Sequence, residues 1–365
     1  MPSERPYQLA WYGCDLRTGG IVEDLPSLKS PPLSRRLGQA TTAQFDLQLG
    51  GAPTDWVAAT THGRSLLVAV DTLTDIPIWA GSVLRRNRGS SLTAPLACAT
   101  LEAYFDRRYT GTVTLTGADQ AAVVSALAAN LLTNGPPFLI DAPNTGVTMD
   151  FSVLNSDDKT VGSALAEVMG MEGGPEWTVD VEWADANHTA FRFPLRVRPK
   201  IGNQAAQPEA TFDFPGSVTE YDQEESYEDG KGATAVIARG EGEGESRLSS
   251  ASYVADGLIA SGMPMYVYRY SPASGLTDPD QLNAHAAKAL GLMGTGASAW
   301  SVTAVASAAP RLGTDWGLGD TIRLDVAPGG QSPGHPQGAS VVARAWAWDL
   351  DVAGDTITPI LVEEA

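Results

Sequence analysis

The residues best suited to chemistry in this chain are the carboxylates of one stretch, residues 220–247. It holds seven Glu and two Asp around a short apolar run, opposed by three basic residues. Carboxylates at this density could bind a divalent cation, or supply the acid and the base of a hydrolytic reaction. The nine candidate site residues are Glu220, Asp222, Glu224, Glu225, Glu228, Asp229, Glu241, Glu243 and Glu245.

The spacing of these and other ligands does not support a metal site. The stretches NSDDKT (155–160) and YDQEESYED (221–229) offer oxygen ligands, but neither matches the EF-hand calcium loop. The four histidines lie in separate segments, and neither Cys14 nor Cys98 belongs to a Cys-x-x-Cys pair, which argues against zinc. We therefore expect no metal and no cofactor, and we expect both cysteines to be buried, reduced thiols.

Catalysis by the acidic stretch is also disfavoured. Catalytic carboxylates need separate environments that move their pKa values apart, whereas a contiguous run is typical of a solvated loop or strand edge. GEGEGE (240–245) is not a phosphate-binding loop, because a Glu at every intervening position would repel a pyrophosphate. The sequence also lacks the Gly-x-Ser-x-Gly motif of serine hydrolases. We predict that the nine carboxylates face solvent, a channel or a subunit edge, without a catalytic role.

Charge and composition exclude further classes. A net charge of −19 and a pI near 4.5 argue against a phosphate-binding surface, although nucleic acid can slide past an acidic wall without sticking. No apolar run is long enough for a transmembrane helix, and the N-terminus has no secretory-signal pattern. Thirty-eight Gly and twenty-four Pro favour a chain of strands and turns.

The first hundred residues show the alternation of apolar and polar side chains that is typical of strands. Gly and Pro clusters separate the apolar runs, and the three prolines of 26–38 predict an extended loop there. The expected strands lie at 7–11, 45–49, 66–70, 76–84 and 92–105.

From residue 111 the pattern becomes that of a small α+β unit. Val123, Leu127 and Leu131 recur at helical spacing in an Ala-rich segment that ends at NGPP. The expected elements are a helix over 118–132, a second helix over 156–170, and a hairpin with strands at 177–183 and 191–197. Residues 201–210 have linker composition.

Strands return after residue 211, beginning with a buried strand near 233–238. A helix is predicted near 278–293, with Asp278 as N-cap and Pro279 at the first helical position. More strands are expected at 300–306, 316–326, 341–352 and 356–362, with a flexible loop at 329–338. The sequence thus predicts a β domain over 1–110, an α+β domain with linker over 111–210, and a β domain over 211–365.

Five stretches of the chain carry a resemblance to one family. They are RTGGIVEDLPSLKSPPLSRRLGQATTAQFDLQL; DIPIWAGSVLRRNRGSS with LEAYFDRRY; ADQAAVVSALAANLL with TVGSALAEVMGMEGGPEWTVDVEW; TAVIARGEGEG; and DPDQLNAHAAKALGLM with LGDTIRLDV. In this order they resemble the baseplate hub, or tail-associated, proteins at the tip of tailed-bacteriophage tails. The likeness is greatest to minor tail proteins of siphophages that infect actinobacteria, and it covers nearly the whole chain.

The resemblance implies a β-rich α+β fold with two tail-tube-like β-barrel domains and an inserted small α+β domain. It implies a structural protein without catalysis, a homotrimer that forms a ring at the distal end of the virion tail. Its implied neighbours are the distal tail protein and other tail-tip, fibre or spike proteins. The tape measure protein and DNA would pass through the ring without specific binding. Since the sequence ends after its last predicted strand, no peptidase or lysozyme module is expected.

Two other functions remain open on the sequence alone. The chain could be a distal tail ring or fibre-attachment protein of the same virion. It could also be a carbohydrate-active β enzyme, in which acidic side chains and some of the nine Trp and ten Tyr line a sugar cleft.

Overall fold

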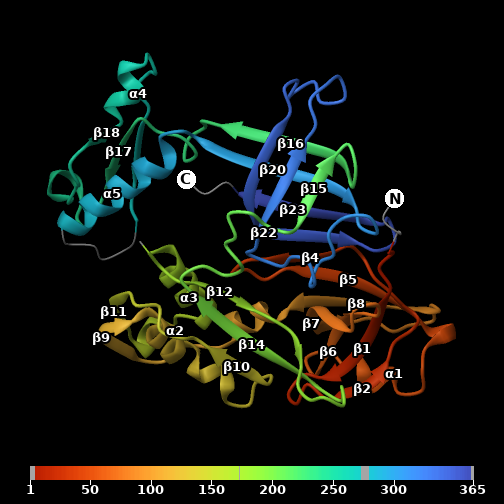
Figure 1. Ribbon diagram of the computed structural model, residues 1–365. Helices are drawn as coiled ribbons and strands as arrows, with labels where there is room; N and C mark the ends of the chain where they lie inside the picture. Colours follow the sequence, from red (N-terminus) through yellow and green to blue (C-terminus); the bar gives the residue numbers. More distant parts are fainter. Residues whose placement is uncertain (1–4, 172, 273–278, 363–365) are drawn as a thin grey trace. The chain divides into compact units, whose positions relative to one another are not determined.

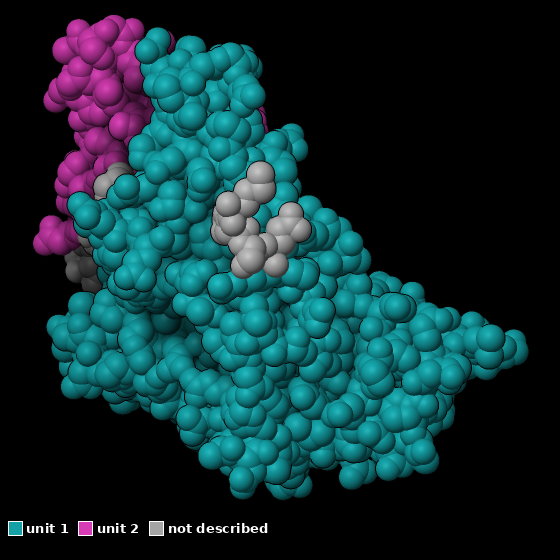
Figure 2. All heavy atoms as spheres, turned by 45° about the vertical axis from the view of Figure 1, so that its right-hand side comes forward, with its two compact units in different colours: residues 1–221, 302–361 teal, residues 222–301, 362–365 magenta. Residues whose placement is uncertain are grey.

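The computed structural model describes residues 5–171, 173–272 and 279–362 of the chain (Figure 1). The chain divides into two compact units, which Figure 2 shows in different colours. The first consists of residues 1–221 and 302–361, and the second of residues 222–301 and 362–365. The first unit therefore combines both ends of the sequence, whereas the second is built almost entirely from one internal segment.

A curled, seven-stranded antiparallel sheet opens the first unit, in the order β2-β1-β6-β7-β8-β5-β3. Its strands are β1 (Leu9–Asp15), β2 (Ile21–Asp24), β3 (Leu28–Lys29), β5 (Thr42–Gln48), β6 (Ser65–Asp71), β7 (Ile76–Arg86) and β8 (Thr93–Thr100), with the short helix α1 (Trp56–Ala59) before β6. All seven residues of the central strand β6 are buried, as its continuous LLVAV run predicts. The rings of Trp11, Phe45 and Trp79 pack together with centroids 5.0 to 6.1 Å apart.

Two sequence predictions in this region need correction. The predicted strand over 92–105 ends at Thr100, and Leu101–Arg107 is a 3₁₀ helix. The helical turns place the side chains of Leu101 and Phe105 in the core. The predicted loop over 26–38 contains β3 and a further strand, β4 (Leu33–Arg36). Short strands fit between the prolines because residues beside Pro are already extended.

The inserted α+β section follows as predicted and packs on the first sheet. It comprises β9 (Val113–Asp119), α2 (Gln120–Ala128), β10 (Phe138–Asp141), β11 (Thr148–Val153), α3 (Val161–Gly170), β12 (Glu176–Val179), β13 (Glu182–Trp183) and β14 (Phe191–Arg198). Both predicted helices are confirmed; the first ends in a 3₁₀ turn over Ala129–Leu132, and the second begins at Val161 because the Thr160 side chain accepts from Ser163 N. The predicted hairpin is confirmed, with β12 and β13 both antiparallel to β14.

The other large sheet of the first unit contains strands from both ends of the chain. Its order is β15-β21-β22-β23-β20-β16, and β4 pairs with β22 off this path. Its strands are β15 (Thr211–Phe214), β16 (Val218–Ser226), β20 (Ala297–Val305), β21 (Thr321–Val326), β22 (Ala339–Asp351) and β23 (Thr356–Val362). The predicted loop over 329–338 joins β21 to β22, while β16 and β20 carry the chain into the second unit and back.

The second unit has a small core of its own. β17 (Ala235–Ala238) lies between β18 (Tyr253–Val254) and β19 (Val267–Tyr270), and two helices, α4 (Asp256–Ala260) and α5 (Pro279–Met293), complete the unit. Val236 and Ala238 pack with Leu282 and Ala286 of α5, which confirms the predicted buried strand and the predicted helix. The predicted N-cap, Asp278, lies outside the described residues.

The protein is thus mostly β, with curled, half-barrel sheets and an inserted α+β section, as the sequence predicts. The division at residues 110 and 210 stays a prediction. Cys14 and Cys98 are free and buried, as expected, and burial raises the pKa of both thiols. No helix among the described residues has both the length and the apolar character needed to cross a membrane.

Candidate functional site

All nine carboxylates of the predicted acidic site are exposed. Four of them lie on β16 (Glu220, Asp222, Glu224 and Glu225), two in the following turn (Glu228 and Asp229), and three in the loop around the 3₁₀ helix Gly244–Ser246 (Glu241, Glu243 and Glu245). Within the described part of the chain, no group of three or more His, Cys, Asp or Glu side chains is arranged to hold a metal ion. The acidic residues therefore form a solvated surface on separate segments.

One lysine pairs with part of this acidic surface. Lys231 Nζ lies 2.5 Å from Glu224 Oε1 and 3.3 Å from Glu228 Oε2. The hydrogen bond from Lys231 lowers the pKa of Glu224, and the same carboxylates raise the pKa of Lys231. β16 is also the last strand of its sheet, and charged side chains on such an edge oppose uncontrolled strand pairing.

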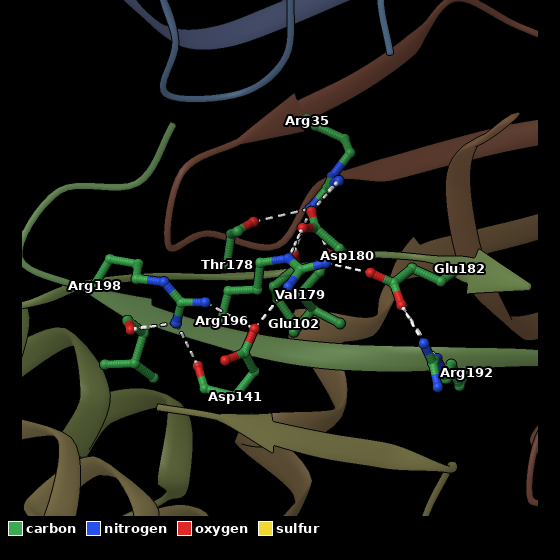
Figure 3. Close-up of polar contacts among 11 residues, drawn as sticks. Arg35, Glu102, Asp141, Thr178, Val179, Asp180, Glu182, Arg192, Arg196 and Arg198 are labelled. Carbon is green, nitrogen blue, oxygen red and sulfur yellow. Dashed lines mark hydrogen bonds and ion pairs between the residues drawn. The ribbon is translucent and has the colours of Figure 1, made fainter. Parts of the chain in front are cut away.

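A second charged cluster, which the sequence analysis missed, lies inside the first unit (Figure 3). β14 points Phe191, Phe193, Leu195 and Val197 into the core and its arginines to the opposite face. Arg196 is the centre of the cluster: its Nε donates to Asp180 Oδ2 and its Nη1 to Asp141 Oδ2, both at 2.6 Å, and Nη2 donates to Glu182. Burial alone would lower the pKa of Arg196, but these carboxylates outweigh burial and raise it.

Arg35 of β4 joins the same cluster from the N-terminal part of the chain. Only 9% of its surface is exposed. Its guanidinium donates to Thr178 Oγ1 at 2.9 Å, to the Val179 carbonyl and to Asp180 Oδ1 at 3.4 Å, and lies 3.5 Å from the buried Glu102 carboxylate. Since β4 also pairs with β22, the Arg35 side chain connects the inserted section to the sheet that contains strands from both ends of the chain.

A cavity of about 560 Å³ opens beside the cluster. Its charged lining includes Arg35, Asp180, Glu182, Arg196, Arg198 and Asp320. The arginines here already bind carboxylates of the chain; Arg198, for example, donates to Asp141 Oδ2 at 2.8 Å, and the hydrogen bond from Arg198 is the main cause that lowers the pKa of Asp141. Because these arginines and carboxylates pair with one another, the arrangement is suited to joining segments of the chain.

Two buried arginine–carboxylate pairs bind the C-terminal segments to the rest of the first unit. Arg344 of β22 donates from Nη1 to Glu176 Oε1 at 2.8 Å and from Nη2 to Glu176 Oε2 at 2.6 Å. It also donates to the carbonyls of Gly319 and Ile201 at 3.1 and 2.9 Å. This bidentate geometry fixes β22 against β12 of the inserted section.

The second pair joins the first sheet to the segment before β21. Arg311 donates from Nε to Asp71 Oδ2 at 2.5 Å and from Nη2 to Asp71 Oδ1 at 2.7 Å. The same guanidinium lies 4.2 Å from the centroid of the Tyr7 ring. The Tyr7 hydroxyl accepts from Leu312 N at 2.7 Å, and burial raises the pKa of Tyr7 to about 12.

The arginines of the cluster around Arg196 and of the two buried pairs leave only a weak signal in the sequence. On β14, arginines at 192, 196 and 198 alternate with large apolar residues, which indicates one apolar and one charged face. A solvated face gives the same pattern, so the ion pairs do not follow from it. Their partners could not be chosen from the sequence, because Asp141 reaches Arg196 only through the parallel pairing of β10 with β14. Arg311 and Arg344 have partners about 240 and 168 positions away, with no local pattern to connect them.

The likeness of this chain to known proteins lies in its fold. No family model matches the chain, and no curated protein matches it in sequence. Among solved structures, a tail protein from Neisseria meningitidis MC58 aligns with a TM-score of 0.60 at 13% identity, covering 98% of this chain and 97% of that one. The 43 kDa tail protein of prophage MuSo2 from Shewanella oneidensis aligns with a TM-score of 0.60 at 10% identity, covering 98% of both chains.

A third match is the prophage tail protein gp18 from Listeria monocytogenes EGD-e, with a TM-score of 0.55 at 9% identity, covering 98% of this chain and 94% of that chain. The likeness extends over nearly the full length of all three proteins. The chain therefore has the fold of these phage tail proteins.

Proposed function

We propose that this chain is a structural subunit of a bacteriophage tail tip, a baseplate hub without catalysis of its own. The observation that supports the proposal most directly is the match over 98% of the chain to phage tail proteins, which are matched over 94 to 98% of their own length. A chain that aligns with tail proteins over nearly its whole length is best explained by the same kind of role.

The proposed assembly is a homotrimeric ring. Its curled sheets resemble parts of a tube wall, and two such sheets in each of three copies would give six wall segments around a channel. The ring would join the distal tail protein to the fibre or spike proteins at the distal end of the tail. The tape measure protein and DNA would pass through it.

The acidic surface supports this proposal electrostatically. All nine of its carboxylates are exposed, and the chain carries a net charge of −19. A wall of negative charge repels the DNA backbone and keeps the polymer mobile, whereas clustered Lys and Arg would bind it. We propose that some of these carboxylates face the channel or a subunit edge.

The buried ion pairs support the structural part of the proposal. A subunit of a tail must transmit force without separating into segments, and Arg35, Arg311 and Arg344 each bind parts of the first unit that are far apart in sequence. No catalytic role is proposed for any of these arginines, because each is occupied by carboxylates or carbonyls of the chain.

The position of the chain in intact particles tests the proposal. Virions are labelled with gold-conjugated antibodies against the purified chain, and antibodies absorbed with that chain serve as the control. We expect gold at the distal end of the tail. Label that is absent from the tail, or that lies on the capsid, would contradict the proposal. A trimeric ring whose channel wall is neutral or basic would remove the electrostatic part alone.

A further inference from the structure

The hairpin formed by β7 and β8 carries a basic surface, although the protein as a whole is acidic. From Ile76 to Leu101 the sequence contains no Asp or Glu, whereas it contains Arg85, Arg86 and Arg88. Arg85 and Arg88 are exposed, and neither forms an ion pair with any residue that the structure describes. In a chain of net charge −19, such a segment is a local feature and cannot be attributed to general solubility.

Two large apolar side chains accompany these arginines. The pairing of β7 with β8 shifts between Val83 and Arg85, so Leu84 is the extra residue of a β-bulge. A bulge re-aims the side chain that it carries. Leu84 is 56% exposed, and Leu92, at the other end of the hairpin loop, is 77% exposed. Exposed leucines beside arginines that lack partners form the kind of surface that a protein partner covers.

Arg86 anchors this hairpin to α1. Its Nη1 donates to Thr60 Oγ1 at 2.9 Å and to the Val57 carbonyl, and its guanidinium lies 5.7 Å from the centroid of the Trp56 ring. Burial is the main cause that lowers the pKa of Arg86, and the positive charge of Arg88 lowers it further. The arginines therefore repel one another on an anchored loop, and an anion from outside the chain would relieve the repulsion.

A complementary acidic surface lies on the same chain. Glu220 and Asp222 are exposed, and because they are two residues apart on β16 they share one face of that strand. β16 is the last strand of its sheet and so has an edge that a partner can approach. Residues 1–110 contain eleven Lys and Arg and ten Asp and Glu, so the excess negative charge of the chain lies almost entirely after residue 110.

We propose that the basic hairpin of one copy, formed by Leu84, Arg85, Arg88 and Leu92, binds the acidic strand β16 of a second copy. Arg85 and Arg88 face Glu220 and Asp222, and the contact covers the two leucines. Because the two surfaces differ, the contact is head-to-tail, which closes into a ring when the rotation between copies permits. The inference rests on the ring proposed above and identifies the two surfaces that form it.

Charge reversal on each side, and on both sides together, tests the contact. The full-length chain is studied by sedimentation velocity over a range of concentrations at low and at high salt, as wild type, R85E/R88E, E220K/D222K and the combined variant. We expect wild-type association that weakens with salt, a loss of about tenfold or more in affinity for each reversal, and substantial recovery in the combined variant. R64E/R107E, which reverses two other exposed arginines of the first unit, is the matched control and should associate as wild type does.

Three results would overturn the inference. The wild-type chain could stay monomeric under all conditions, or the combined variant could associate no more tightly than the variants reversed on one side. The third result is that reversal of the arginines weakens association while reversal of Glu220 and Asp222 does not. The last result would mean that the hairpin binds a surface of the second copy other than Glu220 and Asp222. Failure here is distinguishable from failure of the proposed function, because gold label at the tail tip would remain while the association data fail.

Discussion

The two units of the chain place their charged residues in opposite ways. In the first unit, Arg344 and Glu176 have side chains that are 2% and 10% exposed, and they connect segments far apart in sequence. In the second unit, Lys231 and Glu224 are 41% and 62% exposed and lie seven residues apart. Charge in the first unit joins distant segments, whereas charge in the second unit is left for solvent or for a partner.

This difference has an energetic consequence. Removing one member of a buried pair leaves an uncompensated charge in a medium of low dielectric constant, which is strongly destabilising. An exposed pair is screened by water and salt, and its side chains lose conformational entropy when they meet. The free energy of unfolding should therefore fall on substitution in the buried ion pairs of the first unit, and should change little on substitution in exposed pairs such as that of Lys231 with Glu224.

The largest effect is expected for Arg344→Met. The substitution leaves the Glu176 carboxylate buried without its partner and removes the donor to the Gly319 and Ile201 carbonyls. We expect the free energy of unfolding to fall by about 3–5 kcal/mol. Equilibrium denaturation of the full-length chain measures this change.

Two further variants serve as controls for Arg344→Met. Arg192→Met makes the same chemical change at a pair whose arginine is 45% exposed, and it should change the free energy of unfolding by no more than about 1 kcal/mol. Arg344→Met combined with Glu176→Leu removes the buried charge altogether and should recover part of the loss. A double variant less stable than Arg344→Met alone would contradict the explanation by an unpaired charge.

A smaller, pH-dependent effect is expected for Asp71→Asn. Burial alone would raise the pKa of the Asp71 carboxyl, but the hydrogen bond from Arg311, those from Leu73 and Thr74, and the charge of Arg311 outweigh burial and lower it. A carboxyl with a lowered pKa stabilises the fold above its unfolded pKa of about 3.9, and this contribution is lost as pH falls through the folded pKa. Near neutral pH we expect the free energy of unfolding of the wild type to exceed that of Asp71→Asn by about 1.5–3 kcal/mol.

The measurement is thermal or chemical unfolding of both proteins between pH 7 and pH 3. All other carboxyls are common to the two chains, so their difference in stability isolates Asp71. It should be constant at neutral pH and shrink below about pH 4. A difference that persists unchanged in acid would show that Asp71 stabilises the fold through packing and not through its charge.

Elements with a local pattern could be predicted from the sequence, and elements that depend on distant partners could not. The helices at 118–132 and 278–293 were predictable because helical periodicity and end signals lie within each segment. β4 was not predictable, because its partner β22 lies more than 300 residues later in the chain. Nothing in the segment 26–38 reveals that pairing.

The candidate sites follow the same rule. The acidic stretch was found because its residues are neighbours in sequence, and its exposure agrees with the reading of a solvated edge. The cluster around Arg196 was missed because Asp141 lies on β10, outside the predicted hairpin, whereas Asp180, just after β12, and Glu182, on β13, lie within it. Buried ion pairs depend in general on which distant segments of the chain pack against each other, and a single sequence does not reveal this.

The smallest effect is expected for Lys231→Ala in the second unit. Glu224 and Lys231 are exposed, so the loss of their pair should leave the thermal midpoint of unfolding unchanged within experimental error. The variant should still change one property: the pKa of Glu224 should rise toward its ordinary value, because the hydrogen bond from Lys231 is the main cause that lowers it. An NMR titration of the side-chain carboxyl detects that rise. A fall in thermal midpoint comparable to that of Arg344→Met would mean that the second unit also depends on its ion pairs, and the contrast between the two units would then be wrong.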